Sequence, residues 1–144
     1  MYIKNITLGL IVVGLLGGCS TDIGDIADKY RANPKKGSVV EGIITKDIIP
    51  EVKKYGKREL IAMEYANRCF TKASTVDEAN ICRVNIVKKF GNDYSLDKFQ
   101  SWDKPTKQKV LNFLSHNTSA ISCYMKANEA KDIIGCKDPI DPNF

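Results

Sequence analysis

Four cysteines in the second half of the chain carry the reactive groups whose spacing is most regular. Cys69 and Cys82 enclose the same number of residues as Cys123 and Cys136. Paired thiols can bind a metal, serve as a redox centre or form structural disulfides. The two segments also match at further positions, which indicates a short internal repeat: Phe70 with Tyr124, Lys72-Ala73 with Lys126-Ala127, and Glu78 with Asp132.

Metal and redox chemistry are the weaker interpretations of these pairs. Zinc sites and thioredoxin-like centres use closely spaced cysteines such as C-x-x-C, which this chain lacks, and His116 is its single histidine. Ser115 stands next to His116, but neighbouring residues on a helix do not face each other. The sequence contains no nucleotide-binding or hydrolase motif either. It therefore predicts no metal, no cofactor and no enzymatic activity.

The N-terminus has the layout of an export signal. Lys4 is followed by the apolar run Ile6–Leu16 and then by small residues up to Cys19. A positive n-region, an apolar h-region and a small-residue cleavage site define a signal peptide. The apolar run is also shorter than the roughly 20 residues that a transmembrane helix needs. Residues 1–18 are therefore predicted to be a signal peptide.

The end of this segment, Leu16-Gly17-Gly18-Cys19, resembles the lipobox of bacterial lipoproteins. The resemblance covers only the first twenty residues, and Gly17 is an unusual residue at its position. It implies that Cys19 is lipidated and becomes the first residue of the mature chain, which attaches the protein to a membrane. Ser20 follows the cysteine, and in a cell with two membranes this residue implies the outer membrane, with the domain facing the periplasm.

Export changes the interpretation of the remaining cysteines. Removing Cys19 from the five cysteines leaves an even number in a compartment where disulfides persist. Four cysteines allow three connectivities. Thr75 begins an S/T-x-x-E capping box with Glu78, which places a helix–helix corner between Cys69 and Cys82. We therefore predict the local pairing, Cys69 with Cys82 and Cys123 with Cys136.

The elements that position these cysteines are predicted to be helices. Residues 57–144 are expected to form a small all-α domain of two disulfide-stapled helical hairpins. Helices are predicted from residue 57 to 73, from Thr75 to Phe90, from Asp103 to Ala127, and from Glu129 to Ile134. Residues 19–56 are expected to be a tether and an irregular segment, which could hold one short helix around Ile23 to Arg31 and in which residues 39–52 form either a short strand or a broken helix.

The net charge and the remaining polar residues do not identify a particular reaction or partner. Glu59, Glu64, Asp77 and Glu78 could supply a carboxylate pair, but their spacing does not distinguish them from solvated helix charges. Trp102 is assigned to the core. The net charge of +5 favours anionic surfaces. In an exported protein these are lipids, wall polymers or acidic proteins rather than nucleic acid.

Two functional hypotheses follow from these predictions. The first is an envelope lipoprotein that acts through protein–protein contacts, as an accessory or structural component of an envelope assembly. The second is a protective inhibitor, an immunity or exclusion lipoprotein that neutralises a toxin, a hydrolase or a phage component. The sequence identifies neither the protein partner nor the oligomeric state.

Overall fold

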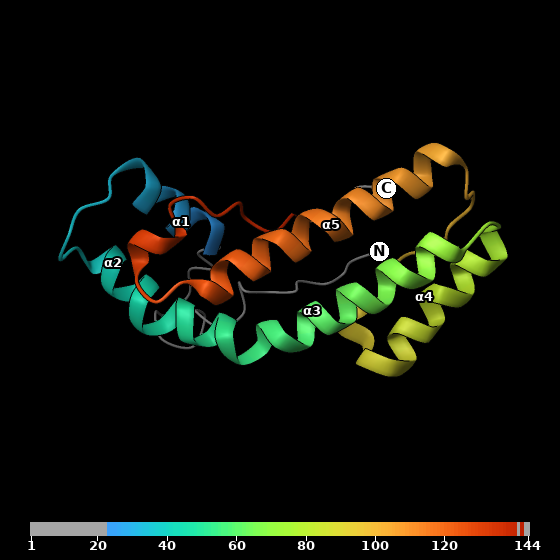
Figure 1. Cartoon of the computed structure of the whole chain (residues 1–144), viewed down its shortest axis with the longest axis horizontal. Helices are drawn as coiled ribbons and strands as arrows, with labels where there is room; N and C mark the ends of the chain where they lie inside the picture. Colours follow the sequence, from blue (N-terminus) through green and yellow to red (C-terminus); the bar gives the residue numbers. More distant parts are fainter. Residues whose placement is uncertain (1–22, 141, 143–144) are drawn as a thin grey trace.

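Two long antiparallel helices form the axis of the molecule. The computed structural model describes residues 23–140 and 142, and every regular element within them is helical. Helix α3 (Ile49–Lys72) lies along α5 (Lys104–Lys126), and this pair makes the most extensive contact between elements. Helix α4 (Val76–Phe90) folds back on one end of α3, while α1 (Ile23–Ala32) covers the other end of α5 (Figure 1). The predicted all-α, disulfide-stapled domain is confirmed.

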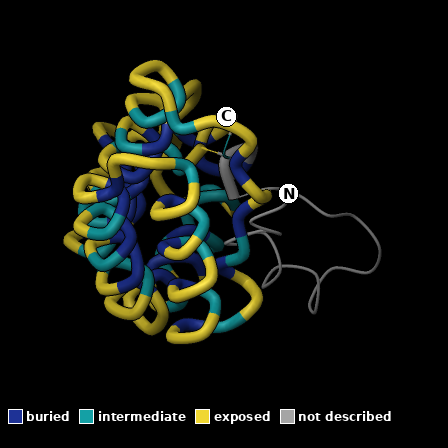
Figure 2. Tube along the Cα trace, turned by 90° about the vertical axis from the view of Figure 1, so that its right-hand side faces the viewer, coloured by how far each residue is buried: buried dark blue, intermediate teal, exposed yellow. Residues whose placement is uncertain are grey.

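The buried side chains form two clusters, one at each end of the α3–α5 pair. Figure 2 shows buried residues on the inward sides of the helices and exposed residues on the outside. The first cluster joins the second half of α3 to α4 and to the start of α5, around Phe70, Ile86 and Phe113. The second joins α1 to the end of α5, around Ile44, Tyr124 and Ile133. Each cluster contains one of the two predicted cysteine pairs.

The predicted starts of two helices are confirmed by their caps. The Thr75 hydroxyl accepts a hydrogen bond from the Glu78 N–H, and the Glu78 carboxylate accepts one from the Thr75 N–H, which is a capping box at the start of α4. Asp103 caps α5 by accepting from the Thr106 N–H at 2.8 Å. Pro105 stands in the first turn of α5, where its missing N–H costs nothing.

The N-terminal part of the chain is more helical than the predicted tether. Residues 23–32 form α1, where a short helix was expected. The stretch that could be a strand or a broken helix is helical, because α2 (Val39–Ile43) runs through a π-helical segment (Ile44–Ile48) directly into α3. The predicted boundary between residues 56 and 57 therefore falls inside α3. Isoleucines at helical spacing, Ile44 and Ile48, pack into the second cluster, so burial outweighs their β-branched preference for strands. Pro50 lies in the first turn of α3, after the π-helical segment, where it is tolerated.

The second predicted hairpin ends in a very short helix. After α5, the helix expected at roughly Glu129 to Ile134 is present as a 3-10 helix (Ala130–Ile133). The Asp132 carboxylate accepts hydrogen bonds from the backbone N–H groups of Asn128 and Glu129, and this tight cap closes a single turn. The second staple therefore joins α5 to a turn.

Helix α3 passes close to α5 at Gly56. A Cβ atom at this position would lie 2.7 Å from Met125 Sδ and 3.3 Å from Ile121 Cγ2. The absence of a side chain lets the two helices meet here, which accounts for a glycine inside a long helix despite its cost of about 1 kcal/mol relative to alanine.

Among the described residues, none of the helices has the length and apolar character needed to cross a membrane.

Candidate interaction surface

All four cysteines of the domain form cross-links, as predicted. Cys69 of α3 is bonded to Cys82 of α4, with their Cα atoms 5.7 Å apart. Cys123 of α5 is bonded to Cys136, with a Cα separation of 5.6 Å. The described residues contain no group of three His, Cys, Asp or Glu side chains placed to hold a metal. The predicted signal peptide and Cys19 lie outside the described residues, so export and lipidation stay predictions.

The four carboxylates that the sequence offered as possible catalysts have separate structural surroundings. Glu64 forms an exposed ion pair with Arg68 on the same helix at 3.4 Å. Glu78 belongs to the capping box, and Asp77 lies beside it in the first turn of α4. Glu59 accepts a hydrogen bond of 2.6 Å from the Tyr94 hydroxyl. These contacts assign Glu64 and Glu78 to helix stability and leave Glu59 as the partly buried exception.

Glu59 carries a partly desolvated charge. Its Oε2 atom is buried and has no hydrogen-bond partner among the described residues. Burial raises the pKa of Glu59, and this effect exceeds the opposing influence of the Tyr94 hydrogen bond and of the Arg58 charge. Burial and the neighbouring carboxylate also raise the pKa of Tyr94. The Arg58 guanidinium lies 5.9 Å from the centre of the Tyr94 ring and donates to the Phe90 carbonyl, which holds this group together.

We expect Glu59→Gln to stabilise the protein at neutral pH by about 0.5 kcal/mol, because the amide keeps an acceptor for Tyr94 and removes a desolvated charge. The pKa of Glu59 is raised by folding, so the wild type regains this stability as the pH falls through that pKa. The difference between variant and wild type should vanish below about pH 4. Urea unfolding between pH 3 and 8 measures it. Glu64→Gln, at an exposed ion pair, is the control, and an equal effect there would contradict the explanation.

The polar residues of α5 hold the C-terminal segment. The buried Asn117 side chain donates to the Ile140 carbonyl at 2.9 Å and accepts from the Ile140 N–H at 2.8 Å. His116 Nε2 lies 2.8 Å from the Asp138 carbonyl oxygen. Both side chains therefore fix the extended tail on α5, and Asn117 has the partner that its place in an apolar stripe requires.

Trp102 and Arg83 close the first cluster. The Trp102 indole packs against Phe70 and Phe99 and donates to the Ala73 carbonyl at 3.0 Å. Its assignment to the core is confirmed, with one edge left accessible. Arg83 donates to the Leu96 carbonyl at 3.1 Å, which directs it toward the connecting segment between α4 and α5.

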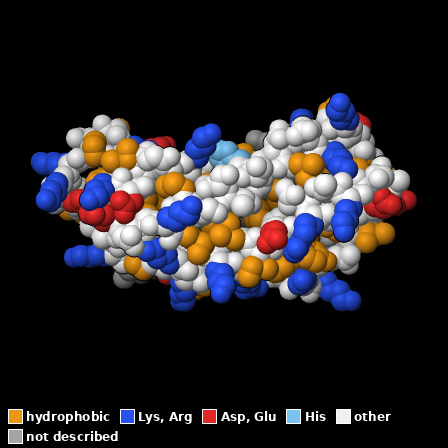
Figure 3. All heavy atoms as spheres, in the orientation of Figure 1, with side chains coloured by type: hydrophobic (Ala, Val, Ile, Leu, Met, Phe, Trp, Pro, Cys, Tyr) orange, Lys and Arg blue, Asp and Glu red, His pale blue; other side chains and the backbone are white. Residues whose placement is uncertain are grey.

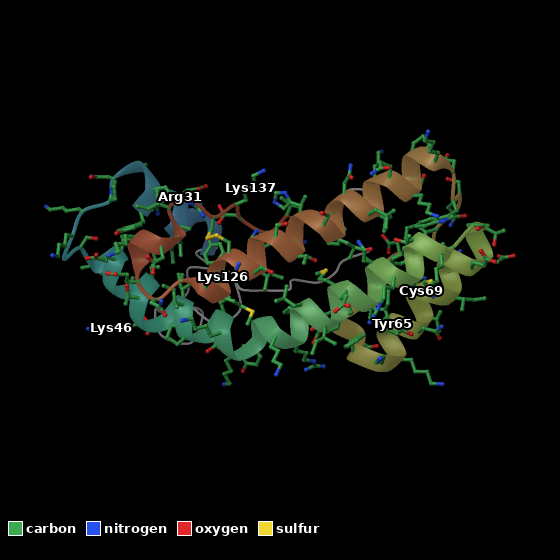
Figure 4. All side chains as sticks on the ribbon, in the orientation of Figure 1. Arg31, Lys46, Tyr65, Cys69, Lys126 and Lys137 are labelled. Carbon is green, nitrogen blue, oxygen red and sulfur yellow. A yellow bond between two sulfur atoms is a disulfide. The ribbon has the colours of Figure 1, made fainter. Side chains whose placement is uncertain are left out.

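Arg31 connects three parts of the chain, and this role was not predicted from the sequence. Its guanidinium donates to both carboxylate oxygens of Asp138, at 2.7 and 3.0 Å. It also donates to the Tyr124 hydroxyl at 2.9 Å and to the Cys136 carbonyl at 2.8 Å. Figure 4 shows Arg31 on α1, next to the tail that includes Lys137. Arg31 lies near the end of the short helix expected in the N-terminal segment, but no local pattern pairs it with Asp138.

This network shifts the titration of its members. Burial alone would raise the pKa of Asp138, but the hydrogen bonds from Arg31 and Tyr124 and the Arg31 charge outweigh it and lower the pKa. Hydrogen bonding to Asp138 raises the pKa of Arg31, and burial raises that of Tyr124. The ion pair is therefore charged across the physiological pH range. It acts as a noncovalent cross-link in addition to the two disulfides.

The outer face of α4 is the candidate interaction surface. The inner face of α4 packs in the first cluster through Ala79, Cys82, Ile86 and Phe90. On the opposite side, Ile81 is 58% exposed and Val84 is 53% exposed. They line a shallow depression together with Asp77, Asn80, Arg83 and Asn85. In Figure 3, hydrophobic side chains reach the surface at the end of the molecule that α3 and α4 form. Helix α4 is therefore apolar on two sides.

Sequence reasoning missed Ile81 and Val84 because it sought one apolar stripe per helix. The available signal was a second set of apolar residues, placed between the core positions Ala79, Cys82 and Ile86. A helix with apolar residues on opposite sides is expected to be covered on both.

Basic side chains mark a second surface, along α3. Lys53, Lys54 and Lys57 are exposed on this helix, and Lys88 and Lys89 are exposed at the end of α4. Lys89 lies over the Tyr65 ring at 4.4 Å. Lys and Arg side chains extend from the edge of the molecule that α3 forms (Figure 3). This distribution agrees with the predicted preference for anionic surroundings, without defining a site.

Comparison of the chain with protein-family models, with curated proteins and with solved structures gives no match.

Proposed function

We propose that this protein is a membrane-anchored envelope lipoprotein that acts through protein–protein contacts, as an accessory or structural component of an envelope assembly. The observation that carries the proposal is the outward apolar pair Ile81 and Val84 on a helix whose other side is already packed. Apolar residues on both sides of a helix are explained by a second packing partner.

The rigidity of the scaffold supports a binding role. Two disulfides and the Arg31–Asp138 ion pair fix both ends of the domain. A preorganised surface loses little conformational entropy when it binds. The anchor proposed at Cys19, inferred from the resemblance to a lipobox, would hold this surface at the outer membrane on its periplasmic side. Confinement to a membrane raises the effective concentration of neighbouring components.

The test is site-specific photo-crosslinking of the full chain in its native cells. A photoreactive amino acid replaces Asn85, which is exposed beside Val84, and in a matched strain it replaces Val39, which is 80% exposed at the opposite end of the molecule. We expect discrete membrane-associated adducts from position 85, identified by mass spectrometry, and none from position 39. Adducts that are equal at both positions, or absent at both, would contradict the proposal. An adduct that forms only with an added toxin or phage protein would support the protective inhibitor instead.

Lipid anchoring at Cys19 is tested separately from the contact surface. Cys19→Ser removes the thiol that lipidation requires, so we expect the chain to leave the detergent-soluble membrane fraction. Its retention in that fraction would contradict lipid anchoring and would leave the contact surface on α4 unaffected.

A further inference from the structure

We propose that the partner of the α4 surface is a second copy of this chain, bound through an antiparallel, two-fold symmetric pairing of the two α4 helices. This inference rests on the proposed function, because it identifies the protein that covers the outward side of α4. It is carried by the order of charged and apolar residues along that side.

Four exposed residues form one narrow seam along α4. Asp77, Ile81, Val84 and Lys88 follow one another at intervals of four, three and four residues. At 100° per residue they fall within about 60° of one another around the helix axis, on the side opposite Ala79, Cys82, Ile86 and Phe90. This is the spacing with which helices pack along a single line of contact.

The seam is complementary to itself when a second copy runs in the opposite direction. A two-fold axis placed between Cys82 and Arg83 puts Ile81 against Val84 of the second copy. The same axis puts Asp77 against Lys88 of the second copy, because both pairs are symmetric about that point. An isologous contact requires this property, that residue i meets j while j meets i. Two apolar contacts thus lie at the centre, and an ion pair lies at each end.

The opposite orientation is disfavoured by the same residues. In a parallel pair, Asp77 would face Asp77 and Lys88 would face Lys88, so that both ends would repel.

The residues on either side of the seam are held in place by hydrogen bonds within the monomer. The Asn80 side chain bonds both backbone groups of Phe99, and Arg83 bonds the Leu96 carbonyl. These residues are therefore in place before association.

The size of the seam sets the strength of the pairing. Stable interfaces bury about 1,200–2,000 Å² in total, and a contact centred on two apolar residues per copy lies below that range. The pairing is therefore weak in dilute solution. Attachment of both copies to one membrane raises their effective concentration and compensates for the small interface.

Charge reversal in membranes tests the pairing. Two full-length copies with different epitope tags are co-expressed with the photoreactive amino acid at position 85, and the yield of mixed-tag dimer is measured. Asp77→Lys places Lys against Lys at both ends, and Lys88→Asp places Asp against Asp, so each single variant should reduce the yield roughly tenfold. Combining an Asp77→Lys copy with a Lys88→Asp copy should restore the yield, because an ion pair re-forms at each end, one with its signs exchanged and the other with the native signs. The double variant should restore it as well.

Lys89→Asp is the matched control, since it makes the same charge change in the same helical turn but lies off the seam. It should leave the dimer yield unchanged, and circular dichroism of each purified variant confirms that it is folded. Loss of dimer in the singles without recovery in the mixed pair would overturn the two-fold pairing. Adducts from position 85 to a different protein only would overturn self-association and leave the proposed function standing. Absence of every adduct would overturn both.

Discussion

Replacing Cys123 and Cys136 together with alanine is expected to lower the free energy of unfolding by about 3 kcal/mol, the chain-entropy value for a loop of this length. The disulfide spans 13 positions and joins the end of α5 to the segment after the 3-10 helix. Without it, the unfolded chain gains conformational freedom. The native chain also loses the covalent attachment of the tail that carries Asp138.

The second disulfide provides an internal comparison for this prediction. Cys69 and Cys82 span the same 13 positions, so the loop-entropy contribution is equal. The α3–α4 corner is also held by the capping box and by the first cluster, whereas the tail depends on a few polar contacts. We therefore expect similar losses of global stability from the two alanine pairs. Increased amide exchange of the native state should appear in residues 128–140 only when the Cys123–Cys136 bond is removed.

Urea unfolding and hydrogen–deuterium exchange of both alanine pairs measure these effects. The wild type treated with a reductant should show the combined loss of stability, and reductant should not affect a variant that lacks all four cysteines. A loss below about 1 kcal/mol for the Cys123–Cys136 pair would show that the unfolded chain is already compact. Equal protection of residues 128–140 in both variants would show that noncovalent contacts alone hold the tail.

Most of the helical domain was predictable because its signals are local. The Thr75–Glu78 capping box and the Asp103-Lys104-Pro105 start each act within one helical turn. The same corner geometry led to the correct cysteine pairing. The all-α fold class followed from apolar residues at helical spacing in α3, α4 and α5.

The N-terminal region was predictable only in part, because distant contacts decide its structure. A short helix was expected near residues 23–31, but residues 39–52 were left open between a strand and a broken helix. Ile44 and Ile48 have a weak preference for helix, yet burial against Tyr124 and Ile133 in the second cluster fixes them in one. The short helix after α5 was expected, but its 3-10 form was not. Arg31 and Asp138 lie 107 positions apart, so no periodicity connects them.

The candidate surface was visible in the sequence in part. Ile81 and Val84 lie between the core residues of α4, and only the packing of α4 on α3 shows which set faces solvent. The matching positions of Asp77 and Lys88 become meaningful once that side is known to be exposed.

Replacing Arg31 with methionine is expected to lower the free energy of unfolding by about 2 kcal/mol at neutral pH. This is less than the 3–5 kcal/mol for a fully buried ion pair, because the pair keeps some contact with solvent. The Arg31 and Asp138 side chains are 17% and 26% exposed. Methionine keeps much of the apolar stem but leaves the Asp138 carboxylate, the Cys136 carbonyl and the Tyr124 hydroxyl without their shared donor.

The loss should depend on pH in a defined direction. Folding lowers the pKa of Asp138, so the ion pair stabilises the protein fully above the ordinary carboxyl pKa of about 4. This contribution disappears as the pH falls through the lowered pKa of the folded state. The difference between wild type and Arg31→Met should therefore be largest near pH 7 and shrink at the acid end. Urea unfolding from pH 2.5 to 7 measures it.

Lys29→Met is the matched control, because it removes one positive charge from an exposed position on the same helix. It should change stability by less than about 0.5 kcal/mol at every pH. A difference between Arg31→Met and wild type that stayed constant down to pH 2.5 would assign the role of Arg31 to its hydrogen bonds with the neutral acceptors, the Cys136 carbonyl and the Tyr124 hydroxyl. A difference that shrinks with Asp138 protonation would instead show that the charge pair fastens α1 to the tail. In that case Arg31 fastens α1, the helix that follows the proposed anchor in the sequence, to the tail, in addition to the packing of α1 in the second cluster.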